Sequence, residues 1–102
     1  MLLADAAQRL AELGNVTRLS IFRLLVKAGP EGLPVGEIQR LLGVPGSTLS
    51  HHIRRLVSVG LVIQTRESRT LYCTAKMEAL RELLDYLVSE CCSGNIDIAE
   101  LP

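Results

Sequence analysis

The chain is short, aliphatic and electrically balanced. Its 102 residues are 48% hydrophobic but only 3% aromatic, which suits one domain with a core of Leu, Val and Ile. Eleven basic residues balance eleven acidic ones, which excludes a polyanion binder that acts through net charge alone. No apolar run is long enough to cross a membrane, and Asp5 interrupts the region where a secretory signal would be apolar. The three cysteines, two of them adjacent, do not make a disulfide framework, so we expect a reducing cytoplasmic location.

Apolar residues at helical spacing predict three helices in the first half of the chain, over about 2–13, 16–28 and 35–42. Asn15 is expected to cap the second helix. A loop, Gly29-Pro30-Glu31-Gly32, precedes the third helix, and Gly43 closes it.

A fourth helix, opened by the turn Pro45-Gly46, has two opposed faces. One face is apolar and the other is polar; the apolar face carries Leu49, Ile53, Leu56 and Val57, and the polar face carries Ser47, Ser50, His51 and Arg54. Hydroxyl, imidazole and guanidinium groups can donate to phosphates and to purine edges in a major groove. A short helix, a turn and a polar-faced helix form the helix-turn-helix pattern.

Two β-prone runs, 61–66 and 70–74, flank a charged tip and predict a hairpin. After Thr74, the expected cap, an apolar stripe from Leu80 to Cys91 predicts a last helix that stops at Ser93-Gly94-Asn95. The expected fold is therefore mainly α with a small β-hairpin: a winged helix-turn-helix in the order ααααββα. We expect a winged-helix DNA-binding and dimerisation domain over 1–92 and a C-terminal tail over 93–102. The apolar first and last helices predict a homodimer formed through them, although they could instead cover each other within one chain.

Charge is distributed unevenly along the sequence. No acidic residue lies between Ile38 and Arg66, whereas four arginines and both histidines lie in that stretch. From Glu78 to Glu100, the sequence has six acidic residues and only one arginine. This asymmetry indicates a local DNA-facing patch, although ordinary solvated charge could also account for it.

The sequence resembles the ArsR/SmtB-type winged-helix repressors over about residues 10–92. The similarity is carried by 13–19 (LGNVTRL), 43–52 (GVPGSTLSHH), 60–62 (GLV), the charged hairpin tip and Leu71-Tyr72. It implies a dimeric cytoplasmic repressor that binds an inverted-repeat operator in double-stranded DNA. Such a repressor leaves the operator when a metal, metalloid or oxidant reaches its sensing site.

The resemblance also assigns DNA contacts to individual residues. The recognition-helix positions that face bases and phosphates are Ser47, Thr48, Ser50, His51 and Arg54. Arg66 and Arg69 match the wing, and Gln39 and Arg40 could touch phosphates from the third helix. Ser68 stands where many relatives have glycine, so the wing tip is expected to turn differently. Arg55 flanks the contacting face and could be a solvated surface charge.

Of the candidate sites for sensing a metal or metalloid, one pair of thiols remains after two other sites are excluded. Segment 33–38 lacks the paired cysteines that some relatives carry in the third helix, and His51 and His52 diverge by about 100° on a helix, which makes them poor joint zinc ligands. Cys91 and Cys92 match a subgroup associated with trivalent arsenic, and soft thiolates select soft acceptors. On a helix these two side chains would also diverge, so joint binding requires the helix to end or unwind there. Cys91 could alternatively be a core residue, and Cys73 is interpreted as a strand residue near the core.

The sequence thus predicts a DNA-binding transcriptional repressor that trivalent arsenicals, arsenite or methylarsenite, release from its operator by binding at Cys91 and Cys92. No resident cofactor is expected; the inducer is an arsenic(III) species, with antimony(III) as another soft candidate. Two alternatives stay open: a thiol redox-sensing repressor of the same fold, and a winged-helix protein-interaction module without DNA binding. An enzyme is not expected, because the sequence has no glycine-rich phosphate loop and no nucleophile–base pair at plausible spacing.

Overall fold

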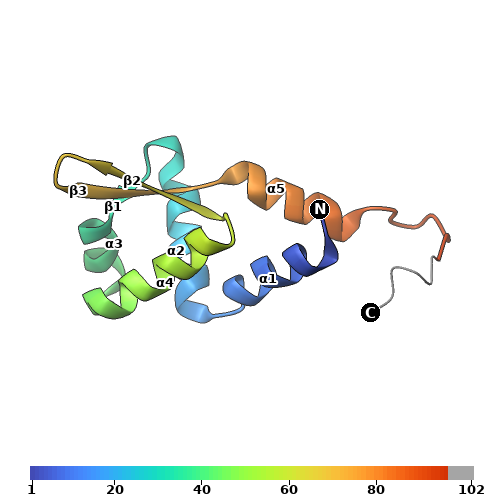
Figure 1. The fold of residues 1–102 in the computed structure, drawn as a ribbon, viewed down its shortest axis with the longest axis horizontal. Helices are drawn as coiled ribbons and strands as arrows, with labels where there is room; N and C mark the ends of the chain where they lie inside the picture. The colour runs from blue at the N-terminus through green and yellow to red at the C-terminus, as the bar shows by residue number, and fades with distance from the viewer. Residues whose placement is uncertain (97–102) are drawn as a thin grey trace.

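A computed structural model describes residues 1–96, and its fold is a winged helix-turn-helix (Figure 1). The elements in chain order are α1 (Leu3–Leu13), α2 (Val16–Ala28), a 3-10 turn η1 (Gly29–Glu31), β1 (Leu33–Pro34), α3 (Val35–Leu42), α4 (Gly46–Ser58), β2 (Val62–Glu67), β3 (Thr70–Ala75) and α5 (Met77–Val88). The strands form an antiparallel sheet in the order β1-β3-β2. The predicted fold class is confirmed. None of the helices in residues 1–96 is long and apolar enough to span a membrane.

Local sequence accounts for most of the boundaries. The side chain of Asn15 accepts a hydrogen bond from the backbone N–H of Arg18, as expected of the cap of α2. Gly43 ends α3 in the left-handed conformation, with φ of 65°, which glycine adopts without steric cost.

Two expectations about the elements are wrong, and one strand was not predicted. Leu33 and Pro34, for which the sequence predicted no element, form β1, which pairs with Cys73 and Tyr72 of β3. Thr74 does not cap α5; it pairs with Ile63 inside the sheet, and α5 begins after Lys76. The last helix ends at Val88, so the stripe that seemed to continue to Cys91 runs past its end.

The core joins α2, α3, α4 and the sheet into a compact head. Its most deeply buried side chains are aliphatic, apart from one thiol: Ile21, Leu25, Ile38, Leu49, Ile53, Leu56, Leu61 and Cys73. This aliphatic core fixes α4 against the rest of the domain.

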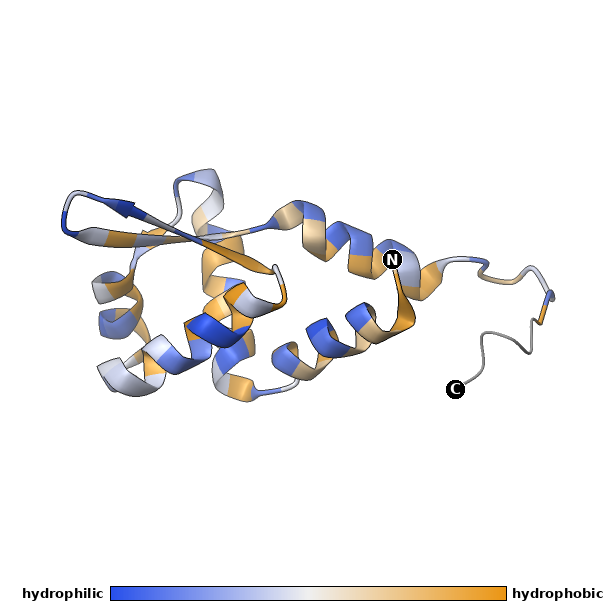
Figure 2. Ribbon diagram, in the orientation of Figure 1, coloured by the Kyte–Doolittle hydropathy of each residue, from blue (hydrophilic) through white to orange (hydrophobic). Residues whose placement is uncertain are grey.

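Helices α1 and α5 extend from this head on the side away from the hairpin tip (Figure 1). Arg9 of α1 donates a hydrogen bond of 3.0 Å to the carbonyl oxygen of Ala79 in α5, which links the two helices. Apolar residues recur along both helices (Figure 2), yet several remain exposed: Leu2, Leu3 and Leu10 near or in α1, and Leu84, Leu87 and Val88 in α5. The alternative that α1 and α5 fully cover each other within one chain is therefore wrong.

Residues 93–96 carry no regular secondary structure, and 97–102 lie outside the described residues. The division between a domain over 1–92 and a tail over 93–102 stays a prediction.

Candidate nucleic-acid interface

The recognition helix α4 turns its apolar face into the core and its polar face outward. Leu49 and Leu56 are fully buried and Ile53 is 1% exposed. The side chains predicted to face DNA are all exposed: Ser47, Thr48, Ser50, His51 and Arg54. A helix anchored on one side and polar on the other can enter a major groove without disturbing the core. That these five residues contact DNA stays a prediction.

The wing is the hairpin of β2 and β3, which pair from Val62 with Ala75 to Glu67 with Thr70. Ser68 and Arg69 form a two-residue turn, and Ser68 has φ of 60°. A positive φ at the first turn position is typical of a type II′ hairpin, which favours glycine there. Ser68 therefore occupies a position whose conformation favours glycine, and the expectation that the tip turns differently from that of relatives stays a prediction. The turn leaves Arg66 and Arg69 exposed at the end of the wing, as the predicted backbone contacts require.

Two further residues predicted to contact phosphates, Gln39 and Arg40, lie in α3. Arg40 is exposed but binds Glu37 through two hydrogen bonds, one of 2.9 Å from Nε to Oε2. This contact lowers the pKa of Glu37, so a phosphate would have to compete with a carboxylate for Arg40. Gln39 lies close to the start of α4. Its side-chain Nε2 would be 3.5 Å from a Cβ placed on Gly46. The phosphate contacts of Gln39 and Arg40 stay a prediction.

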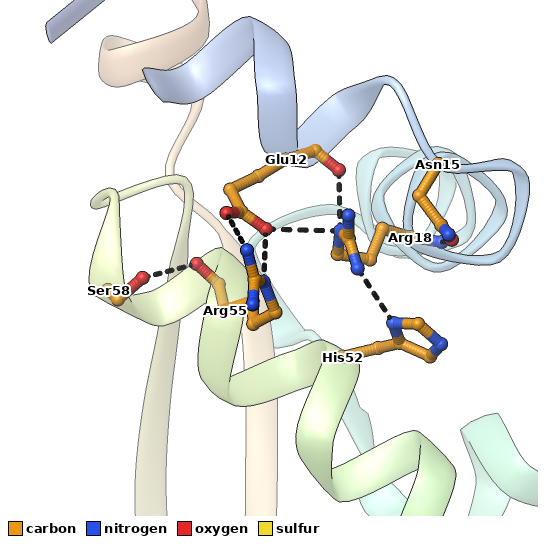
Figure 3. Close-up of polar contacts among 6 residues, drawn as sticks. All are labelled: Glu12, Asn15, Arg18, His52, Arg55 and Ser58. Carbon is orange, nitrogen blue, oxygen red and sulfur yellow. Dashed lines mark hydrogen bonds and ion pairs between the residues drawn. The ribbon is translucent and has the colours of Figure 1, made fainter.

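An ion-pair network behind α4 was not predicted from the sequence (Figure 3). Glu12 of α1 is buried, with 8% exposure, and its carboxylate accepts two hydrogen bonds from Arg55 of α4, at 2.8 Å and 2.9 Å. Arg18 of α2 lies 3.1 Å from the same carboxylate through Nε and donates a 2.7 Å hydrogen bond to the carbonyl oxygen of Glu12. The hydrogen bond from Arg55 holds the pKa of Glu12 below its ordinary value, despite the opposing effect of burial. Arg55 is thus a structural partner of α1, and no local pattern could pair residues 43 positions apart.

The network continues to His52. Nη1 of Arg18 lies 3.1 Å from Nδ1 of His52. Because a guanidinium can only donate, Nδ1 must accept, and the ring is neutral with its proton on Nε2. Burial, and next the charge of Arg18, lower the pKa of His52, which favours this neutral form. His52 therefore faces the protein, whereas its neighbour His51 is exposed.

The two histidines do not form part of a metal cluster. Their ring centroids are 5.9 Å apart, and residues 1–96 contain no group of three or more His, Cys, Asp or Glu side chains able to hold a metal ion.

Cys91 and Cys92 lie together beyond the end of α5. Both are exposed, and their sulfur atoms are 2.7 Å apart. Glu90 and Cys92 have φ of 60° and 66°, so the backbone has left the helix and the two side chains no longer diverge. The expectation that the pair sits on the last helix is wrong, as is the alternative that Cys91 is a core residue of this chain. The hydrogen bond with Cys92 raises the pKa of Cys91.

Cys73 is in β3 and fully buried, as its interpretation as a strand residue near the core predicted. Burial raises the pKa of its thiol, which keeps it protonated and unreactive.

The helix-turn-helix, the wing and the outward polar face of α4 together define a winged-helix domain of the DNA-binding type. A family model described as a helix-turn-helix domain matches residues 13–65. The chain belongs to the ArsR/SmtB-type family of winged helix-turn-helix transcriptional regulators.

Individual relatives agree with this assignment. The Halobacterium salinarum protein ArsR2, whose name describes an arsenical resistance operon repressor, is 33% identical over 83% of this chain and 72% of its own length. Nodulation protein NolR of Rhizobium meliloti is also 33% identical, over 80% of this chain but only 65% of NolR, which is less than two thirds. The solved structure of HlyU from Vibrio cholerae N16961 matches 82% of this chain and 91% of HlyU, with 33% identity and a TM-score of 0.67. Their names differ, and membership of the family does not identify the signal.

Proposed function

We propose that this chain is a homodimeric transcriptional repressor that binds an inverted-repeat operator through α4 and the wing. The observation that carries the proposal is the separation of faces on α4. Its apolar side is sealed in the core while hydroxyls, an imidazole and Arg54 are presented to solvent. Each monomer reads one half-site, and a twofold dimer reads two half-sites about 34–36 Å apart.

Exposed apolar surface on α1 and α5 supports the homodimer. Leu84 and Leu87 of α5 are each 51% exposed, and Leu10 of α1 is 43% exposed. Leu84 also lines an apolar hollow of about 370 Å³ between α2 and α5, together with Leu19 and Val26. Apolar surface exposed on two helices that contact each other is typical of a protein–protein interface. Because a twofold interface pairs one patch with itself, α1 and α5 of a second copy would cover it.

Arg54 provides the test of DNA binding. Arg54→Gln should weaken binding to an operator, selected from a random duplex pool by the wild-type protein, by about 1–3 kcal/mol, because a bidentate or phosphate contact is lost. Arg81→Gln on α5 removes the same charge from an exposed site on another element and should leave affinity nearly unchanged. Electrophoretic gel shifts across a salt series would measure both effects, since phosphate contacts make affinity fall steeply with salt. Equal affinities for the two variants would contradict the assignment of α4 to the groove, and a wild-type protein that selects no duplex would favour the protein-interaction module.

We further propose that trivalent arsenicals release the operator by binding at Cys91 and Cys92. The support is geometric: two exposed thiols with sulfurs 2.7 Å apart form a ready chelate for a soft acceptor. With a monomethyl arsenic(III) dihydroxide, each thiol gives up its proton, each sulfur bonds to arsenic and two waters leave. Only Ser89 and Glu90 separate the pair from α5, so a change in its turn would act on the exposed end of the dimer helix at Leu87 and Val88. Repositioning these helices would change the spacing of the two α4 helices and weaken their match to the operator.

The thiol pair is tested by substitution. A Cys91→Ser and Cys92→Ser double variant should bind the operator like the wild type but should not be released by arsenite or methylarsenite, because a hydroxyl does not replace a soft thiolate. Cys73→Ala is the matched control, since its thiol is buried and should play no part. Operator occupancy measured by fluorescence anisotropy during arsenical titration reports release. Release that survives in the double variant would place the sensing site elsewhere.

The close contact between the sulfurs also favours a second candidate, a redox signal. Loss of two hydrogens to an oxidant such as peroxide would join Cys91 and Cys92 in a disulfide, again without unwinding α5. Intact-protein mass spectrometry separates the candidates: oxidation removes two hydrogens or adds oxygen, whereas arsenical binding adds the mass of arsenic.

A further inference from the structure

Three helices of the chain converge on one buried carboxylate. Glu12, near the end of α1, holds Arg55 of α4 through two parallel hydrogen bonds and Arg18 of α2 through a 3.1 Å ion pair (Figure 3). Arg18 in turn reaches His52, one helical turn before Arg55 on α4. The recognition helix is therefore held at two successive turns, by Arg18 of α2 at His52 and by Glu12 of α1 at Arg55.

The geometry points to Glu12 as a positioning residue: through Arg55 and Arg18 it sets the orientation of α4 relative to α1, and so relative to the dimer seam. This inference rests on the proposed function, because it concerns how the recognition helices of an operator-binding dimer are aligned.

The chemistry of the contact supports an orienting role. A guanidinium that donates two parallel hydrogen bonds to a carboxylate fixes direction as well as distance. A carboxylate as buried as Glu12 is costly to leave unpaired, so movement of α1 should draw α4 with it instead of breaking the contact. α1 carries exposed apolar residues on one part of its surface and Glu12 on another, so it links the proposed dimer surface to the recognition helix.

Adjacent arginines on α4 have divided roles in this arrangement. Arg55 is bound by Glu12, which neutralises it and directs it toward α1. Arg54, the next residue back, is exposed on the polar face. Glu12 therefore keeps one cation in the scaffold while its neighbour remains available to DNA.

The Glu12→Gln variant separates a positioning role from simple electrostatics, because the two predict opposite changes in the affinity for the operator. Removal of a negative charge should by itself strengthen binding to any duplex. Loss of the positioning contact should instead weaken binding to the selected operator by about tenfold, a coupling expected for residues that share one network. Binding to a scrambled duplex of the same composition should stay equal or rise. The ratio of the two affinities is the readout, and loss of folded protein would lower both together.

Two further variants complete the experiment. Glu31→Gln removes the same charge from an exposed position in η1 and should leave the ratio unchanged. Arg55→Lys keeps the charge but not the paired hydrogen bonds, so its operator affinity should lie between those of the wild type and Glu12→Gln. Circular dichroism and sedimentation would establish that each variant is folded and has the oligomeric state of the wild type.

The outcomes are distinguishable. If folded Glu12→Gln keeps the wild-type ratio, or if both affinities fall in parallel, the positioning role is overturned while the proposed function stands. If the wild-type protein selects no operator at all, the proposed function fails and this inference fails with it.

Discussion

Leu84→Glu is expected to convert the dimer into a folded monomer and to lower operator affinity by about 100-fold or more. Leu84 lies on α5 with 51% of its surface exposed, so the single chain tolerates a charge there. In a twofold interface each substitution occurs twice, and two carboxylates would be placed in an apolar seam, where unpaired charge is costly. The loss of affinity follows because two linked half-site contacts typically bind about 10²–10⁴-fold more tightly than one alone.

Val16→Glu is the control for this variant. Val16 is the first residue of α2 and is 83% exposed, and it belongs neither to α1 or α5 nor to α4 or the wing. It should leave both mass and operator affinity close to those of the wild type. Sedimentation equilibrium and anisotropy titration would measure the two properties. A Leu84→Glu protein that stays dimeric would show that the copies associate through another surface.

The sequence predicts the helices well because their signals are local. Apolar spacing defined α2, α3 and α4, and the polar face of α4 follows from its buried face, since side chains on a helix repeat every 3.6 residues. Asn15 and Gly43 act as boundary residues through their own backbone and side-chain chemistry. These features needed no knowledge of distant parts of the chain.

The errors arise where distant residues decide the structure. β1 has only two residues and exists because Leu33 and Pro34 meet β3 some 40 positions later, by the pairing of Leu33 with Cys73. Thr74 has the chemistry of a cap, but its pairing with Ile63 holds it in the sheet.

The end of α5 shows a different limit. Cys91 has helical spacing from Leu87 and Val88, but spacing cannot show that the backbone has already turned at Glu90, where φ is 60°. The candidate thiol pair was therefore identified by residue type, while its usable geometry came only from the structure. The network of Glu12 was missed for the same reason as β1: its partners lie on other elements.

Leu49→Ala should cost about 2–5 kcal/mol of unfolding free energy, the usual range for a fully buried leucine. Leu49 has no exposed surface and stands on α4 between Thr48 and Ser50, two residues predicted to face DNA. Since small domains are stable by only about 5–15 kcal/mol, this loss should produce a large drop in the urea midpoint.

Leu41→Ala removes the same atoms from α3, where the side chain is 47% exposed, and should cost about half as much or less because less apolar surface returns to water. Urea unfolding followed by circular dichroism compares the two variants at a fixed protein concentration, which matters because dimerisation is linked to folding. The contrast tests the premise on which the DNA-facing surface depends: α4 presents its polar residues only because its other side is locked in the core. Equal losses for the two variants would mean that Leu49 is not the anchor its burial indicates, and the outward orientation of Thr48 and Ser50 would then have no structural basis.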